Sequence, residues 1–346
     1  MSIKPLIRSS TASMILRSAY MPLILPTLPP RVRPESTKFL EIVIEKYNAS
    51  TTQFVLSTEN NQKLIGEDNT ISLDLDDLKT HASSMVDNRI DDVGAEINIF
   101  STLDHSTPNY IRNNNCWAHD INLTCVSVWN SESNNGQQTQ TLITRDAIIG
   151  SKHDGYYLNE NATIRFVNND NQVITRTVGK GMEVAGTNND FYISLLKTEI
   201  DPDVDGIYPC RVLPKNFNDY LIDSGSSPRT TNIPALCLNQ YKEAIVKDLS
   251  SAGDTISSYN TLFNVPTDPT RLSFDKSMIT GDSGSPAFII INNQLVLVTT
   301  WHYGGSTPIG SSIVHWYDNI NTALRTLGSK YWLKIPDLNS FKKYYS

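Results

Sequence analysis

From about Pro108 onward the sequence consists of short apolar runs that are separated by clusters of asparagine, glycine, aspartate and proline. The runs include LTCVSVW, TLITRDAIIG, ATIRFV, QVITRTV, FYISLL, AFIII and QLVLVTTW. Short runs with turn-forming residues between them are typical of β-sheets that close into barrels or pack as sandwiches. The pattern therefore predicts a mainly β fold. One segment differs: WYDNINTALRTLG has helical spacing, with Asp318 as the expected N-cap and Gly328 where the helix should end.

Two further regions precede this β-rich domain. Residues 1–35 carry Pro22, Pro26, Pro29 and Pro30, and because proline fixes φ and disfavours helix, we expect an extended arm. The sequence leaves open whether the arm docks on a neighbouring subunit or particle, or packs as a strap on its own chain. Residues 36–107 contain alternating runs such as TISLDLDDL, which predict a small β-rich module. Residues 108–346 form the third region, which ends in the helix and a tail.

The charge balance argues against two classes of partner. The chain has 29 basic and 36 acidic side chains, for a net charge of -7, which gives a nucleic-acid backbone little to bind. No apolar run approaches the roughly 20 residues that a membrane-spanning helix needs, so no membrane span is expected. Arg17 and the prolines interrupt the N-terminal apolar stretch, so it does not resemble a signal peptide, and the location of the protein stays open.

The four cysteines, Cys116, Cys125, Cys210 and Cys237, include no Cys-x-x-Cys pair. We therefore expect neither a metal site nor a bound cofactor. A bridge between Cys116 and Cys125 in an oxidising compartment, or four reduced thiols that pack as small apolar side chains, both fit the sequence.

The most specific motif is Gly281-Asp282-Ser283-Gly284-Ser285-Pro286, directly before the run AFIII. Acyl transfer by a serine needs a tight turn whose backbone N–H groups converge beside the hydroxyl, and flanking glycines permit that turn. We expect Ser283 to be the nucleophile, with the N–H groups of Gly281 and Ser283 forming an oxyanion hole. A turn without chemistry is the alternative. The six-residue string resembles the nucleophile loop of the trypsin/chymotrypsin family of serine peptidases.

A serine nucleophile needs a base and an orienting carboxylate. His153 ends TLITRDAIIGSKH, which is similar to the segment that carries the catalytic histidine in this family. The rival is His119 in CWAHD, which lacks the preceding pair of apolar runs. Asp190 opens DFYISLLK, which resembles the aspartate segment of the family with two extra residues before its Leu-Leu-Lys end. The chain order His153, Asp190, Ser283 is that of the chymotrypsin fold.

The resemblance covers about residues 110–328 and implies a fold and a substrate pocket. The implied fold is two six-stranded antiparallel β-barrels with the site between them, followed by a C-terminal helix. The implied pocket has Ser277 at its floor, Thr300-Trp301-His302 as the strand that pairs with substrate, and Gly310 beside it. An uncharged floor favours uncharged residues at the cleavage site, and His302 in place of a wall glycine narrows the pocket.

The sequence also departs from the family. No Ile-Val-Gly-Gly start precedes the barrel to pair with Asp282, and Asp154 and Ile279 stand where many members carry disulfide cysteines. These departures favour a microbial or viral type. The sequence thus predicts a serine endopeptidase that acts on polypeptides. Two alternatives stay open: a non-catalytic structural or binding component of a larger assembly, such as a virus or phage particle, and an esterase.

Overall fold

The computed structural model describes residues 42–48, 53–58, 63–67, 70–91, 94–128, 138–186, 189–221, 231–253 and 259–345. The arm expected at residues 1–35 lies outside the described residues. The chain divides into two compact units, Met1–Asp76 with Leu338–Lys342, and Asp77–Asp337 with Lys343–Ser346. The boundaries expected after residues 35 and 107 stay predictions.

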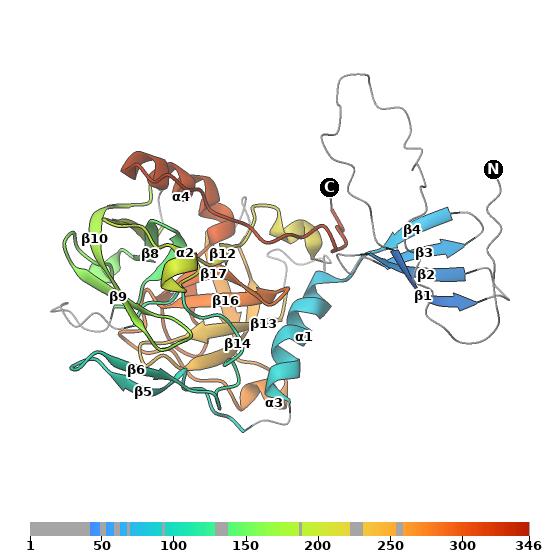
Figure 1. The fold of residues 1–346 in the computed structure, drawn as a ribbon, viewed down its shortest axis with the longest axis horizontal. Helices are drawn as coiled ribbons and strands as arrows, with labels where there is room; N and C mark the ends of the chain where they lie inside the picture. The colour runs from blue at the N-terminus through green and yellow to red at the C-terminus, as the bar shows by residue number, and fades with distance from the viewer. Residues whose placement is uncertain are drawn as a thin grey trace, which may run out of the picture. The chain divides into compact units, whose positions relative to one another are not determined.

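The smaller unit contains an antiparallel sheet in which consecutive strands pair in the order β1-β2-β3-β4 (Figure 1). Short connections and sequential pairing are what a β-meander requires. The strands are β1 (Ile42–Asn48), β2 (Gln53–Thr58), β3 (Lys63–Glu67) and β4 (Thr70–Asp74).

The larger unit begins with helix α1 (Leu78–Ile90). The Asp77 side chain caps the helix by accepting a hydrogen bond from the Thr80 N–H at 2.7 Å. Buried residues at a spacing of four form its inner face, which packs against strands β13 and β16: Leu78, Ala82, Val86 and Ile90. A two-stranded hairpin of β5 (Phe100–Asp104) and β6 (Asn109–Arg112) follows.

The next sheet is a half-barrel of five antiparallel strands in the order β7-β8-β11-β10-β9. Its strands are β7 (Thr141–Thr144), β8 (Ala147–Ser151), β9 (Thr163–Val167), β10 (Val173–Glu183) and β11 (Phe191–Leu196). Strands β8 and β11 are neighbours, so the residues that follow β8 and precede β11 lie close together at one end of the sheet.

The second sheet closes on itself. Its strands are β12 (Arg211–Val212), β13 (Ile233–Leu238), β14 (Ala244–Ser251), β15 (Asn260–Asn264), β16 (Pro286–Ile291), β17 (Gln294–Tyr303) and β18 (Ile309–Ser311). Strands β13, β14, β15, β18, β17 and β16 form a six-stranded ring, because β18 pairs with both β15 and β17. Strand β12 adds a two-residue parallel pairing to β17 outside the ring.

The structure does not show the second closed barrel that the sequence led us to expect. Among the described residues, the segment Val126–Val128 reaches both edges of the half-barrel, but only through isolated bridges to Thr141 and Arg165. The buried polar side chains that follow are used for other contacts: the Gln138 and Gln140 amides donate to the carbonyls of Gly155 and Tyr156 at 2.7 and 3.2 Å. These contacts hold the loop around His153 and do not extend a strand ladder.

Helix α4 (Ile313–Leu327) follows the closed barrel. Its N-cap is Ser312, whose hydroxyl accepts from the His315 N–H at 3.1 Å, so the expected cap Asp318 lies inside the helix. Gly328 ends the helix as expected, with φ of 91°, a conformation that favours glycine. The apolar face of α4 packs against β10, β11 and β17. None of the helices among the described residues is long and apolar enough to cross a membrane.

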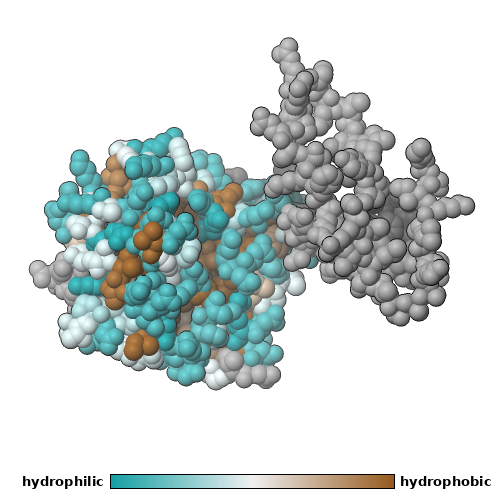
Figure 2. All heavy atoms as spheres, in the orientation of Figure 1, coloured by the Kyte–Doolittle hydropathy of each residue, from teal (hydrophilic) through white to brown (hydrophobic). Residues whose placement is uncertain are grey.

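The core of the larger unit lies inside the two sheets, where all six residues of β13 and of β16 are buried. The face drawn in Figure 2 is mostly hydrophilic over the coloured residues, with hydrophobic side chains in small separate groups. Scattered exposed apolar residues of this kind are normal for a folded protein and do not mark a docking surface by themselves.

Candidate active site

The Ser283 loop is built by two glycines with positive φ, 100° at Gly281 and 81° at Gly284. A Cβ on Gly284 would lie 3.2 Å from the carbonyl oxygens of both Thr139 and Tyr156, so the loop needs glycine there on two grounds. The Gly284 N–H donates to the Trp301 carbonyl at 3.0 Å, which fixes the loop to strand β17. The turn therefore presents the half-buried Ser283 in one defined orientation.

The Asp282 side chain fixes the loop to neighbouring backbone through hydrogen bonds. Its carboxylate is buried and accepts backbone N–H bonds from Gln240 at 3.0 Å and from Ile279 at 2.8 Å. Burial raises the pKa of Asp282, although these hydrogen bonds and the Lys242 ammonium oppose that rise. Both carboxylate oxygens of Asp282 thus have hydrogen-bond donors within the chain, and neither needs the ammonium of a newly cut N-terminus as a partner.

Lys242 is a buried cation beside this anchor that the sequence did not reveal. Its Nζ donates to the Thr139 hydroxyl at 2.6 Å and to the Gln240 carbonyl at 3.4 Å. The Thr139 carbonyl also limits the space at Gly284, so the Lys242 ammonium contacts a residue that packs against the nucleophile loop. Nothing in NQYKEA distinguishes this lysine from one on an exposed turn.

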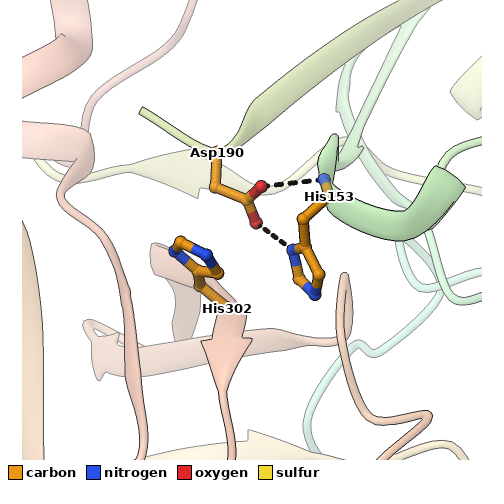
Figure 3. Close-up of side chains that lie close together, drawn as sticks. All are labelled: His153, Asp190 and His302. Carbon is orange, nitrogen blue, oxygen red and sulfur yellow. Dashed lines mark hydrogen bonds and ion pairs between the residues drawn. The ribbon is translucent and has the colours of Figure 1, made fainter. Parts of the chain in front are cut away.

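His153 follows β8 and opens a short 3-10 turn, His153–Gly155. Its Nδ1 lies 2.7 Å from Asp190 Oδ2 (Figure 3). Its Nε2 lies 2.9 Å from Ser283 Oγ. The backbone N–H of His153 donates to the other oxygen of Asp190 at 2.9 Å. A carboxylate only accepts, so Nδ1 carries the proton and Nε2 is left to accept from the serine hydroxyl.

Asp190 precedes β11 and its side chain is only 4% exposed. Burial alone would raise its pKa, but hydrogen bonds from His153 and Ser151, together with the nearby imidazoles of His153 and His302, outweigh burial and lower the pKa. Ser151, at the end of β8, also donates its hydroxyl to Asp190 Oδ2, a role that no motif in the sequence indicates. The Asp190 N–H in turn donates to the Ser311 hydroxyl at 2.9 Å. The carboxylate is therefore held charged and in one orientation.

His302 lies against the same pair. Its ring centroid is 4.8 Å from that of His153, with an interplanar angle of 33°, and the Tyr303 ring stacks on it with centroids 4.0 Å apart. Burial lowers the pKa of His302, the Asp190 charge opposes this, and nearby His153 and Lys152 lower it further. Ligand atoms of His153, Asp190 and His302 lie within 4.8 Å of one another (Figure 3), so these side chains could in principle hold a metal ion. Such an ion would compete with the His153–Asp190 hydrogen bond.

The other expected pocket residues lie in different settings. Ser277 is exposed, whereas Thr300 and Trp301 are buried in the barrel wall, where the Trp301 indole donates to the Leu238 carbonyl at 2.9 Å. Gly310 pairs opposite Trp301, and a Cβ on it would lie 2.3 Å from the Thr300 carbonyl. Thr300, Trp301 and Gly310 are thus part of the packed barrel wall. The substrate pocket itself stays a prediction.

The rival base, His119, is exposed and its Nδ1 lies 3.0 Å from the Cys116 carbonyl. It lines a cavity of about 310 Å³ together with Arg112, Asp120 and several asparagines. Neither Ser283 nor Asp190 is among the residues of that cavity. Of the two candidate histidines, His153 is the one that the structure brings to Ser283.

Replacing Lys242 with methionine is expected to flatten the pH dependence of stability. Burial lowers the pKa of Lys242 from 10.5 to about 7, although the Asp282 charge opposes the shift. Between these two values the unfolded chain binds more protons than the folded one, so this residue makes stability rise with pH there. The free-energy difference between Lys242→Met and the parent should change by up to about 1.4 kcal/mol per pH unit in that window.

Urea unfolding at several pH values between about 7 and 10 measures this slope. The matched control is Lys180→Met, because Lys180 is exposed and should leave the slope of the parent unchanged. Identical slopes for the parent and Lys242→Met would show that Lys242 is not a buried, titrating amine.

The three candidate catalytic residues come from separate parts of the larger unit: His153 after β8, Asp190 before β11, and Ser283 before β16. They form one continuous chain of hydrogen bonds from a buried carboxylate to a half-buried hydroxyl. No protein-family model and no curated protein matches the sequence, so this geometry is the basis for assigning a function.

Proposed function

We propose that the chain is a serine endopeptidase that hydrolyses peptide bonds through Ser283, His153 and Asp190. The observation that carries the proposal is the position of His153: Nε2 is 2.9 Å from Ser283 Oγ while Nδ1 is 2.7 Å from Asp190 Oδ2. A serine hydroxyl becomes a nucleophile only when a positioned base takes its proton. This arrangement supplies the base, and the carboxylate fixes its tautomer.

The chemistry proceeds in two halves. Ser283 Oγ attacks the peptide carbonyl while its proton passes to His153 Nε2, and the charge of Asp190 stabilises the imidazolium that forms. His153 then gives the proton to the leaving amine, and an acyl-serine remains. Water attacks this ester with His153 again as the base, which releases the acid and restores Ser283.

An oxyanion hole formed by the N–H groups of Gly281 and Ser283 completes the proposal. Neither N–H group donates to an acceptor among the described residues, although the neighbouring Asp282, Gly284 and Ser285 N–H groups all do. Donors left unused in an otherwise fully bonded loop are suited to the negative oxygen of a tetrahedral intermediate.

The proposed substrate has uncharged side chains near the cleaved bond. Two large apolar residues beside the nucleophile loop are exposed, Ile279 at 50% and Tyr303 at 60%. The chain brings them near each other, because Met278, next to Ile279, and Gly305, two residues after Tyr303, exchange two backbone hydrogen bonds. An apolar rim of this kind favours apolar or aromatic residues of a polypeptide.

Membership of the trypsin/chymotrypsin family, in a microbial or viral form, is part of the proposal. Its support is the half-barrel followed by a closed barrel and a C-terminal helix, together with the chain order of the three residues. All four cysteines are free, which agrees with a form that lacks the family disulfides.

A non-catalytic component of an assembly on the same fold is the second candidate. The close approach of His302 to His153 favours it, because the His302 ring occupies space next to the base that a substrate could otherwise use. In this case Ser283 would be inert although its hydrogen bonds persist.

A fluorophosphonate probe separates the two candidates. The active peptidase should gain one covalent phosphonyl group, and mass spectrometry of peptides should locate it on Ser283. Cleavage of casein should follow, whereas hydrolysis of a short ester without any cleavage of casein would favour an esterase. An unlabelled protein with native circular dichroism would contradict the proposal and support the non-catalytic component.

A further inference from the structure

Two of the four cysteines lie side by side at one edge of the half-barrel. The Leu142 N–H of β7 donates to the Cys125 carbonyl at 2.8 Å, and the Cys210 N–H donates to the Leu142 carbonyl at 3.1 Å. Because the N–H and C=O of one strand residue point to the same side, Cys125 and Cys210 both flank that side of Leu142. The Cys125 side chain helps to raise the pKa of the Cys210 thiol, which agrees with two side chains that lie near each other. The sequence suggested a different pair, Cys116 with Cys125, and these two are free thiols in the structure.

The same two residues line a cavity of about 290 Å³ together with Asn122, Tyr208 and Arg211. The cavity gives small reagents a space beside both cysteines, although each residue is at most 5% exposed. The other two cysteines are placed differently. Cys237 is fully buried in β13, and Cys116 lines the separate cavity that contains His119.

We propose that Cys125 and Cys210 form a reversible disulfide when the protein meets a small disulfide oxidant such as oxidised glutathione. One cysteine thiolate attacks the glutathione disulfide, which breaks that S–S bond, forms a mixed disulfide and releases one glutathione thiolate. The second cysteine then attacks the mixed disulfide at the protein sulfur and releases the second glutathione. One S–S bond forms, one breaks, and the two thiol protons go to the two glutathiones.

The bond would join the chain segment that precedes the five strands of the half-barrel to the segment that follows them. Cys125 precedes β7 in the chain and Cys210 follows β11, so all five strands fall between them, along with His153 and Asp190. This is the sheet that has no closing sixth strand among the described residues. The cross-link would stabilise this sheet by restricting the unfolded chain. A long closed loop of this kind should raise the melting temperature by about 5–10 °C.

The reaction should be slow at neutral pH. Burial, and then the contact with Cys125, raise the pKa of the Cys210 thiol well above its ordinary value, so little thiolate is present. Only the thiolate attacks a disulfide, so the rate should increase toward about pH 9.

The test uses the reduced full-length protein, incubated with oxidised glutathione under native conditions at about pH 9 and then alkylated. Mass spectrometry should find a peptide that links Cys125 to Cys210, with Cys116 and Cys237 alkylated. Cys210→Ser should form no internal bond, and Cys125→Ser is the second variant if that protein does not fold. The matched control, Cys116→Ser, should form the bond as the parent does.

Four alkylated thiols in the parent, or a bond that uses Cys116 or Cys237, would overturn the proposal. A linked protein whose melting temperature does not rise would overturn the stabilising role. Neither readout depends on peptide hydrolysis, so the result stands apart from whether Ser283 is a nucleophile.

Discussion

Replacing Ser283 with alanine is expected to lower kcat/KM on a peptide substrate by at least about 10,000-fold, with no loss of folded structure. The substitution removes only the oxygen that lies 2.9 Å from His153 Nε2, and the turn is held by Gly284 and Asp282, not by the Ser283 side chain. Without that oxygen no acyl-enzyme can form. Steady-state hydrolysis and circular dichroism of the two proteins measure both expectations.

The motif supplies its own matched control in Ser285, two residues along the chain. The Ser285 hydroxyl is buried and has no hydrogen-bond partner among the described residues, so Ser285→Ala should keep activity close to that of the parent. His153→Ala should lose as much activity as Ser283→Ala, and the double variant should lose no more, because the two residues act as one unit. His119→Ala should be nearly neutral. Activity in Ser283→Ala near that of the parent would show that another residue is the nucleophile.

The candidate catalytic residues could be read from the sequence because each lies where a local pattern ends. Ser283 lies on a turn that two glycines require, and their positive φ values are a local property of the chain. His153 and Asp190 lie at the end and the start of apolar runs that became β8 and β11. Short-range rules on turns and strand ends are sufficient for such positions. Of the predicted fold, one closed six-stranded barrel and the C-terminal helix are confirmed.

Features that depend on distant contacts could not be read in the same way. Whether a sheet closes depends on which edges meet, and the segment Val126–Val128 makes only isolated bridges to the two edges of the half-barrel. Lys242 resembles an exposed lysine in sequence, yet its ammonium bonds to Thr139, more than a hundred residues away. Helix α4 begins earlier than expected because Ser312 caps it. Its first residues, Ile313 and Val314, are buried, and the sequence around them marks the start of a helix less clearly than Asp318 does. Tertiary packing decided each of these cases.

Asp190→Asn provides the most direct test of the hydrogen-bond chain, with an expected fall in kcat/KM of about 10,000-fold. In the parent, three donors converge on the Asp190 carboxylate: the His153 N–H, the His153 ring at Nδ1, and the Ser151 hydroxyl. An asparagine amide accepts with only one of its two ends and donates with the other. If its NH₂ group faces the ring, Nδ1 must become the acceptor and the proton moves to Nε2. His153 then points an N–H at Ser283 and cannot take the serine proton.

The same substitution should also change how stability depends on pH. The folded pKa of Asp190 lies below its ordinary value of 3.8, so the unfolded state takes up the proton first as the pH falls. Its charge therefore contributes stability that is fully present above about pH 4 and is lost as the pH falls through the lower folded pKa. Asp190→Asn should have a lower melting temperature than the parent at neutral pH, and this difference should become smaller once the pH drops below the ordinary pKa of aspartate.

Asp170 is an exposed turn residue, so Asp170→Asn is the matched control and should alter neither kcat/KM nor the melting temperature relative to the parent. Thermal unfolding across the acid range and kcat/KM at one neutral pH measure both effects in the same protein preparations. If Asp190→Asn were as fast as the parent, the carboxylate would not orient the base, and the non-catalytic reading of the fold would become the better one.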